Sequence, residues 1–305
     1  MITPRLLRRS YRRTLQWRFL LLWIGVVAIP AIAALAPAWR FVDAHLGHSP
    51  RAPQLATVLD SHAAADLLKG LVEPAAATSF EAGACTAALL ALLCAPFAAG
   101  AALALASAPE PLRFRALLAG AAGHYGRMLR AGLVSLLPFG LAAAAVAGLS
   151  RAFAKAVESA VLEGQAVRYG RLAALAGFLL LFVAQLTVDA GRAAFAAEPH
   201  RRSAWLAWWS GARLVFRRPG RAVVAGGATL AAAALLAAVF LLLRAHIHQA
   251  GVGTVCLAFL LAELAVASVG WNRAARLSAL AELMRADAAD RARRSGLSAA
   301  DASGS

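Results

Sequence analysis

Acidic residues and lysine are scarce in this sequence. Among its 305 residues there are only 15 Asp and Glu, and lysine occurs only at Lys69 and Lys155. Charged residues make up 15% of the chain and hydrophobic residues 61%, whereas a soluble domain usually has about 25% charged and roughly 45–50% apolar residues. The composition therefore argues against an ordinary soluble domain and indicates a membrane protein.

Cysteine is rare in the sequence, and the common catalytic motifs are absent from it. The three cysteines, Cys85, Cys94 and Cys256, all lie within apolar runs, which argues against a disulfide framework or a zinc-ligand spacing. The sequence contains no G-x-S-x-G, H-E-x-x-H or Walker A motif and no glycine fingerprint after a strand. We therefore expect neither enzymatic activity nor a cofactor.

Long apolar runs dominate what is present. A helix of about 20 apolar residues crosses the hydrocarbon core of a bilayer, and these runs lack the alternation of barrel strands. The sequence therefore predicts an all-α polytopic membrane protein with six transmembrane helices. The first run follows a basic stretch, but its length and the five later runs favour an anchor helix over a cleaved signal peptide. The six runs are 19–39, 82–107, 131–150, 172–188, 222–243 and 251–271.

The net charge of +16 is distributed unevenly between the connecting segments. If the N-terminus is inside, 23 of the 31 Lys and Arg lie in cytoplasmic segments and 8 in outer segments. This ratio follows the positive-inside rule and predicts that both termini are cytoplasmic. A basic cytoplasmic face attracts anionic lipid head groups, so the charge does not require a nucleic acid partner.

The two cytoplasmic connections, 111–130 and 201–220, have the pattern of elbow helices that lie in the membrane interface. In the second, Ser203 is a candidate N-cap and Pro219 marks the end. The two segments share a rhythm, because Leu118-Ala119 and Gly123 match Leu206-Ala207 and Gly211, although any basic interfacial helix has a similar composition. Tryptophan and arginine favour the head-group layer, and the predicted anchors are Trp205, Trp208, Trp209, Arg217 and Arg218.

The stretch VDAGRAAF (188–195) and the following RRSAWLAWWSGARLVFRRP (201–219) resemble uncharacterised six-helix families of the bacterial inner membrane. The layout is also similar to the membrane domain attached to some glycerophosphodiester phosphodiesterases. The resemblance covers about residues 80–275. It implies six helices with cytoplasmic elbows and a bacterial inner-membrane location, and it implies no activity.

The remaining segments complete the predicted organisation. Residues 1–18 form a basic cytoplasmic helix, and 19–271 form a single transmembrane domain. Its outer segment, 40–81, contains one or two short amphipathic helices. Residues 272–294 form a charged helix, because alanine, leucine, arginine and glutamate favour one, and the small polar tail 295–305 is disordered.

One carboxylate interrupts the sixth run, in AFLLAELAV (258–266). An ionised Glu263 in mid-span costs about 2.5–3.5 kcal/mol, so it must be protonated, face the bundle interior or have a partner. Gln185, Asp189 and Arg192 lie on one helical face of span four and are the candidate partners. They predict either a polar clamp that fixes helix packing or a proton- or cation-coupled site between spans four and six.

Five of the seven histidines fall in outer segments. Neutral imidazoles suit zinc or copper, so His62, His246 and His248 are weak candidates for a metal site. Lone histidines near head groups are more often ordinary interfacial residues, and we expect no metal. The sequence favours a membrane-embedded subunit or scaffold that contacts lipids and a possible protein partner, with a small coupled transporter as the alternative.

Overall fold

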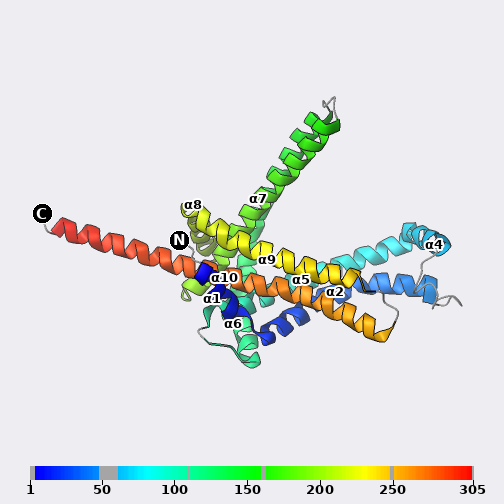
Figure 1. Cartoon of the computed structure of the whole chain (residues 1–305), viewed down its shortest axis with the longest axis horizontal. Helices are drawn as coiled ribbons and strands as arrows, with labels where there is room; N and C mark the ends of the chain where they lie inside the picture. The colour runs from blue at the N-terminus through cyan, green and yellow to red at the C-terminus, as the bar shows by residue number, and fades with distance from the viewer. Residues whose placement is uncertain (1–3, 48–60, 109, 159–162, 248–250, 304–305) are drawn as a thin grey trace. The chain divides into compact units, whose positions relative to one another are not determined.

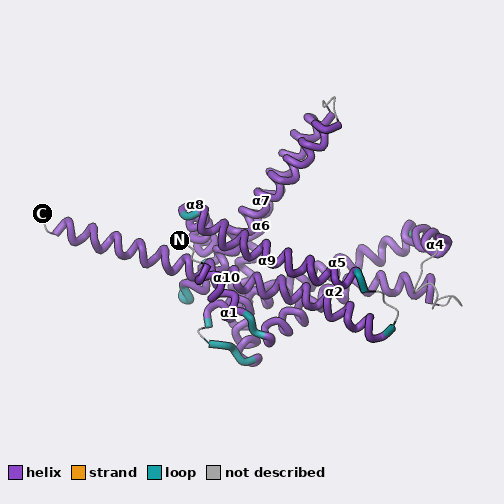
Figure 2. The backbone as a smooth tube through the Cα atoms, viewed as in Figure 1, coloured by secondary structure: helices purple, strands orange, loops and turns teal. Residues whose placement is uncertain are grey.

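The computed structural model describes residues 4–47, 61–108, 110–158, 163–247 and 251–303 (Figure 1). Six of its helices are long and apolar enough to cross a membrane, and they correspond to the six predicted runs. The fold class is therefore confirmed as an all-helical protein with six candidate spans, and no strand occurs in the described residues (Figure 2). These helices are α2 (Trp17–Val42), α5 (Pro74–Ser107), α6 (Phe114–Glu158), α7 (Glu163–Ala197), α9 (Pro219–Ala245) and α10 (Val252–Ser303).

Large apolar side chains project outward from these six helices. Ile32 of α2 is 68% exposed, Leu136 of α6 is 68% exposed and Phe259 of α10 is 66% exposed. A monomeric soluble protein rarely exposes large continuous apolar surfaces. The outward apolar side chains therefore support the membrane assignment independently of helix length.

Shorter helical segments precede or connect the spans. Helix α1 (Pro4–Thr14) is separated from α2 by Leu15 and by the extended backbone of Gln16. The π-helical segment η1 (Asp43–Gly47) and helix α4 (Ser61–Val72) belong to the predicted outer segment. Helix α8 (Ala204–Arg217) lies between α7 and α9.

The chain divides into two compact units, and the predicted domain boundaries stay a prediction. The first unit contains α1, the end of α5 from Gly100, α6, α7, α8, the start of α9 to Ala231, and α10 from Asn272. The second contains α2, η1, α4, α5 to Ala99, α9 from Ala232, and α10 to Trp271. Sequence periodicity identifies each helix but not this grouping, which depends on the side chains that meet.

Small residues set the helix crossings of the first unit. A Cβ atom added at Gly211 of α8 would lie 2.6 Å from the carbonyl carbon of Ala190 and 2.8 Å from Cα of Gly191, both on α7. A Cβ added at Gly100 of α5 would lie 2.8 Å from the carbonyl oxygen of Ala121 on α6. Backbones this close require small residues, as is usual between membrane helices.

The second unit is packed in a similar way. Gly270 of α10 lies against the indole ring of Trp23 on α2, where an added Cβ would be 2.6 Å from ring carbons. At the other end of α2, Gly83 of α5 lies against Pro37, and Phe41 contacts Phe80 with ring centroids 5.8 Å apart. Helices α2, α5 and α10 are therefore joined by small-to-large contacts.

The two predicted elbows have different outcomes. The second is a separate helix, α8, whose N-cap Ser203 accepts a hydrogen bond from the Leu206 amide as predicted, and Pro219 starts α9. The first is not separate, because α6 begins at Phe114 and continues without a break to Glu158. No proline follows Phe114 until Pro138, and the helix continues through Pro138.

Two further expectations differ from the structure. Helix α10 continues to Ser303, so the predicted disordered tail is helical over 295–303, where no proline ends the helix. The predicted match between Gly123 and Gly211 does not hold in packing. Gly123 has no neighbour within 4 Å in the position of a Cβ, and Ala121 makes the close approach to α5 instead.

This difference allows a matched pair of substitutions. We expect Gly211→Ala to lower the free energy of unfolding by roughly 1–3 kcal/mol, because the new methyl group overlaps backbone atoms of α7. Gly123→Ala has open space, and alanine favours a helix by about 1 kcal/mol over glycine, so its stability should equal or exceed that of the wild type. Thermal unfolding in detergent measures both, and equal melting temperatures for the two variants would contradict the α7–α8 crossing.

Candidate functional site

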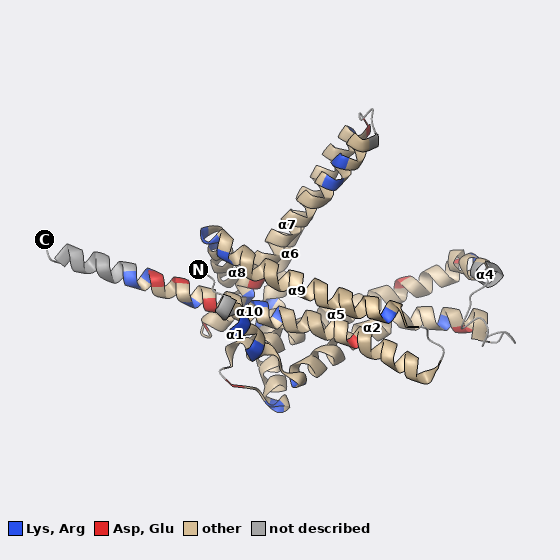
Figure 3. Cartoon of the chain, viewed as in Figure 1, with Lys and Arg blue, Asp and Glu red and all other residues tan. Residues whose placement is uncertain are grey.

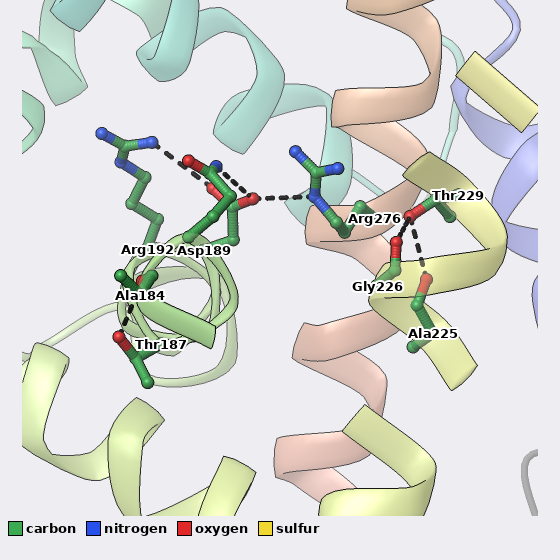
Figure 4. Close-up of polar contacts among 9 residues, drawn as sticks. Ala184, Thr187, Asp189, Arg192, Ala225, Gly226, Thr229 and Arg276 are labelled. Atoms are coloured by element: carbon green, nitrogen blue, oxygen red, sulfur yellow. Dashed lines mark hydrogen bonds and ion pairs between the residues drawn. The ribbon is translucent and has the colours of Figure 1, made fainter. Parts of the chain in front are cut away.

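A buried carboxylate forms the centre of the first unit. Asp189 of α7 is fully buried, and Gln185 one turn earlier donates a hydrogen bond to its Oδ2 at 2.8 Å. Arg192 Nη1 lies 3.4 Å from Oδ1, and Arg276 Nε of α10 lies 2.7 Å from Oδ2 (Figure 4). The predicted grouping of Gln185, Asp189 and Arg192 on one face is therefore observed, and we name these three residues with Arg276 the Asp189 centre.

Positive charge exceeds negative charge at the Asp189 centre. Arg192 and Arg276 contact the carboxylate directly, and Arg273 of α10 adds a third positive charge near it. A buried ion is costly unless it is paired and hydrogen-bonded. Removal of one partner from such a pair is strongly destabilising. The carboxylate therefore holds together arginines of two helices that would otherwise repel one another.

Little space remains beside this centre. The cavity lined by Arg192, Gly191, Ser135 and Trp208 measures about 10 Å³, which is the volume that one water molecule needs. This cavity is therefore too small to hold a transported solute beside the Asp189 centre. The arrangement fixes α7 against α10 and fits the clamp interpretation.

Arginines also bind the carboxyl ends of helices in the first unit. Arg285 of α10 donates to the carbonyl of Ala196 at the end of α7, at 2.9 Å. Arg13 of α1 donates to the carbonyl of Ala108, just after α5, also at 2.9 Å, and lies 3.6 Å from Glu282. Cations at helix C-termini interact favourably with the helix dipole and with its free carbonyls. Several of the arginines counted as a basic face are thus structural.

Tyr11 attaches α1 to the start of the charged part of α10. Its hydroxyl donates a hydrogen bond to Oδ1 of Asn272, which is fully buried. Burial raises the pKa of Tyr11, and the nearby charge of Arg276 opposes this shift. The phenol is therefore neutral at physiological pH and acts as a hydrogen-bond donor.

Glu263 is not part of the Asp189 centre. It is half-buried on α10, and no hydrogen bond or ion pair joins it to any residue that the structure describes. Of the two pairings expected for Arg192, the one with Asp189 is observed, and the one with Glu263 stays a prediction. The partner that α10 supplies to Asp189 is Arg276.

Arg276 was missed because it lies beyond the apolar run of α10. One sequence feature identifies it in retrospect. In the predicted topology, spans four and six run in the same direction, and Asp189 and Arg276 each lie just past the cytoplasmic end of their span. An acidic and a basic residue at similar depth on parallel spans can form an ion pair, and this pattern singles out Arg276.

The predicted interfacial anchors fall into two groups. Trp205 and Trp209 of α8 are 50% and 46% exposed, whereas the Nε1 atom of Trp208 is buried. Arg217 is exposed. Arg218 has a different role, because its Nε lies 2.8 Å from Asp287 and its Nη2 lies 2.9 Å from Asp290, both on α10. This contact ties the α8–α9 junction to α10.

A cavity of about 510 Å³ opens beside that ion pair. We call it the basic groove, because four arginines and two aspartates line it and the positive charge is in excess. Arg218 is paired with Asp287 and Asp290, and Arg291 lies 3.3 Å from Asp287. The remaining excess charge suits an anionic group. The charged residues of the groove are Arg217, Arg218, Arg221, Arg291, Asp287 and Asp290.

The histidine candidates do not form a metal site in the part of the chain that the structure describes. His248 and the side chain of His62 lie outside the described residues. His246 is exposed, and its Nδ1 lies 2.7 Å from the carbonyl of Leu242 one turn earlier. Among the described residues, no three His, Cys, Asp or Glu side chains lie close enough to hold a metal ion.

The six long apolar helices support a multi-span membrane protein. Comparisons with family models, with curated proteins and with solved structures found no match for this chain. The resemblance to six-helix inner-membrane families therefore stays a prediction. The function must be argued from the residues themselves.

The Asp189 centre makes a direct prediction about stability. Asp189→Asn keeps the shape of the side chain but leaves three arginines without their carboxylate. We expect it to lower the free energy of unfolding by about 3–5 kcal/mol. Glu263→Gln is the matched control and should unfold like the wild type, because Glu263 has no partner among the described residues. Tryptophan fluorescence during thermal unfolding gives both values, and a stable Asp189→Asn variant would rule out the clamp.

Proposed function

We propose that this chain is a non-enzymatic, multi-spanning protein of a bacterial inner membrane with both termini in the cytoplasm. It acts as a membrane-embedded subunit or scaffold of an envelope or transport assembly. The six apolar helices support the membrane location. The excess of arginine in the segments 1–18, 108–130, 189–221 and 272–305 supports the orientation.

The buried and fully paired carboxylate of the Asp189 centre is the observation that favours a scaffold over a transporter. Its carboxylate is fully buried and already bound by Gln185, Arg192 and Arg276. A transporter binds its substrate near the bilayer midplane, usually between interrupted helices. Pro30, Pro96 and Pro138 all lie inside helices that continue through them. A fixed clamp and continuous helices support a structural role.

The cytoplasmic face supplies the surface through which the scaffold acts. Helix α8 exposes Trp205, Leu206, Trp209 and Phe216, so it suits the interface between lipid tails and head groups. Arg213 lies over the ring of Trp209 at 5.6 Å. Together with the basic groove, this helix provides positive charge for anionic head groups or for an acidic segment of a partner.

Glu263 is the observation that favours the alternative, a small proton- or cation-coupled transporter. A half-buried carboxylate in mid-span with no partner among the described residues is a functional-site candidate by default. In this alternative the coupling site lies between spans four and six and includes Glu263, Asp189 and Arg192. Loss of solute flux in Glu263→Gln, with unchanged stability, would favour transport.

A purification experiment tests the scaffold directly. Native mass spectrometry of the tagged full chain, extracted gently from its own membrane, should show a protein partner in fixed stoichiometry. Mutation of the exposed Arg217 and the half-buried Arg221 to Gln should weaken the retention of anionic lipid or partner without lowering the melting temperature. A chain that emerges alone, with a small solute bound, would contradict the scaffold and support the transporter.

Cysteine labelling tests the orientation. The native Cys85, Cys94 and Cys256 are first replaced by alanine, and single cysteines are then placed at the exposed positions Glu73 and Arg202. A membrane-impermeant maleimide should label Glu73→Cys on intact spheroplasts and Arg202→Cys only after lysis. Labelling of Arg202→Cys from outside would reverse the proposed topology. These positions avoid buried residues such as Ala212, where burial alone would prevent labelling.

A further inference from the structure

Glu263 is the only Lys, Arg, Asp or Glu within the six apolar runs of the sequence. Every other acidic residue lies in a connecting or terminal segment. The charge is therefore not explained by proximity to water at a span end. It also has no hydrogen bond or ion pair with a described residue, so the chain does not satisfy it in the way it satisfies Asp189.

The helix face around Glu263 is exposed on one side and packed on the other. One turn earlier on α10, Phe259 is 66% exposed and Leu260 is 53% exposed. One turn later, Ala267 is buried, and Gly270 beyond it lies against Trp23 of α2. Glu263 thus stands at the edge of an unpartnered apolar face, where a neighbouring helix would cover it together with Phe259 and Leu260. We call this surface the Glu263 face.

Charge complementarity identifies what covers this face. An ionised carboxylate next to lipid is costly, and a cation at the same depth removes that cost. A second copy of this chain offers no such cation, because its apolar runs contain neither lysine nor arginine. A cation at this depth would therefore have to come from a different protein.

We propose that the Glu263 face binds a transmembrane helix of a different protein, and that a lysine or arginine within that helix pairs with Glu263. The proposal rests on the scaffold function and specifies the chemistry of its partner. The partner helix is apolar, carries one basic residue near mid-span and packs over Phe259 and Leu260.

A synthetic peptide supplies the test. The donor-labelled full chain is reconstituted in phosphatidylcholine vesicles with an acceptor-labelled poly-leucine transmembrane peptide that carries one central lysine. The comparison peptide has leucine in place of the lysine. Energy transfer should show that the lysine peptide associates roughly tenfold more tightly than the leucine peptide, as expected for a polar contact between membrane helices.

Variants of the chain separate this contact from general effects. Glu263→Gln should reduce the preference for the lysine peptide to within about twofold, and Glu263→Asp should retain it. Glu81→Gln, which changes an exposed carboxylate outside the apolar runs, should behave like the wild type. Equal association of both peptides with the wild type, or an undiminished preference in Glu263→Gln, would overturn the proposal.

Two further outcomes distinguish this proposal from the scaffold function. If the wild type and Glu263→Gln both purify with the same stoichiometric partner, the scaffold stands and the Glu263 contact is overturned. If the wild type purifies alone, the scaffold itself fails. Energy transfer between two copies of the chain that disappears in Glu263→Gln would show that Glu263 joins two copies, which overturns a heterologous partner.

Discussion

A carboxylate buried among helices is costly unless the protein pairs it with positive charge. Two helices supply that charge to Asp189. Arg192 lies on the same helix as Asp189, whereas Arg276 lies on α10. The Nε atom of Arg276 is 2.7 Å from the carboxylate of Asp189. The arginines in turn need Asp189, because without it three cations would share one core. This mutual requirement fixes the register of α7 against α10.

The rest of the first unit is consistent with this register. Gly191 lies two residues after Asp189, and its backbone is in contact with Gly211 of α8. A shift of α7 would therefore disturb both this contact and the ion pair between Asp189 and Arg276. Arg285 reaches the end of α7, and Arg218 joins the α8–α9 junction to α10 through Asp287 and Asp290. The second half of α10 carries both acidic and basic residues (Figure 3), and Asp287 and Asp290 form ion pairs with Arg218 and Arg291 there.

Much of this arrangement could be predicted from local sequence, and the remainder depends on tertiary contacts. Apolar runs identify the six spans because helix length and hydrophobicity are local properties. Helical periodicity places Gln185, Asp189 and Arg192 on one face, and Ser203 identifies the start of α8. Periodicity does not say which helices meet, so Arg276 was missed as the partner that α10 supplies to Asp189. The unbroken start of α6 was also unexpected, because a basic amphipathic stretch has the same composition whether it forms an elbow or the end of a span.

Two carboxylates thus have opposite environments in one chain. Asp189 is saturated with partners inside the protein, whereas Glu263 has none among the described residues and borders an exposed apolar face. The proposed subunit role rests on this contrast between a carboxylate paired inside the chain and one left for a partner.

The most direct measurement of the clamp is a double-mutant cycle between Asp189 and Arg276. The free energies of unfolding of Asp189→Asn, Arg276→Gln and the double variant are compared with that of the wild type in the same detergent. If the two side chains form the central contact, the interaction energy should fall in the range of about 0.5–3 kcal/mol that contacting residues show. Additive effects, with an interaction energy near zero, would mean that the two residues act independently and would contradict the account.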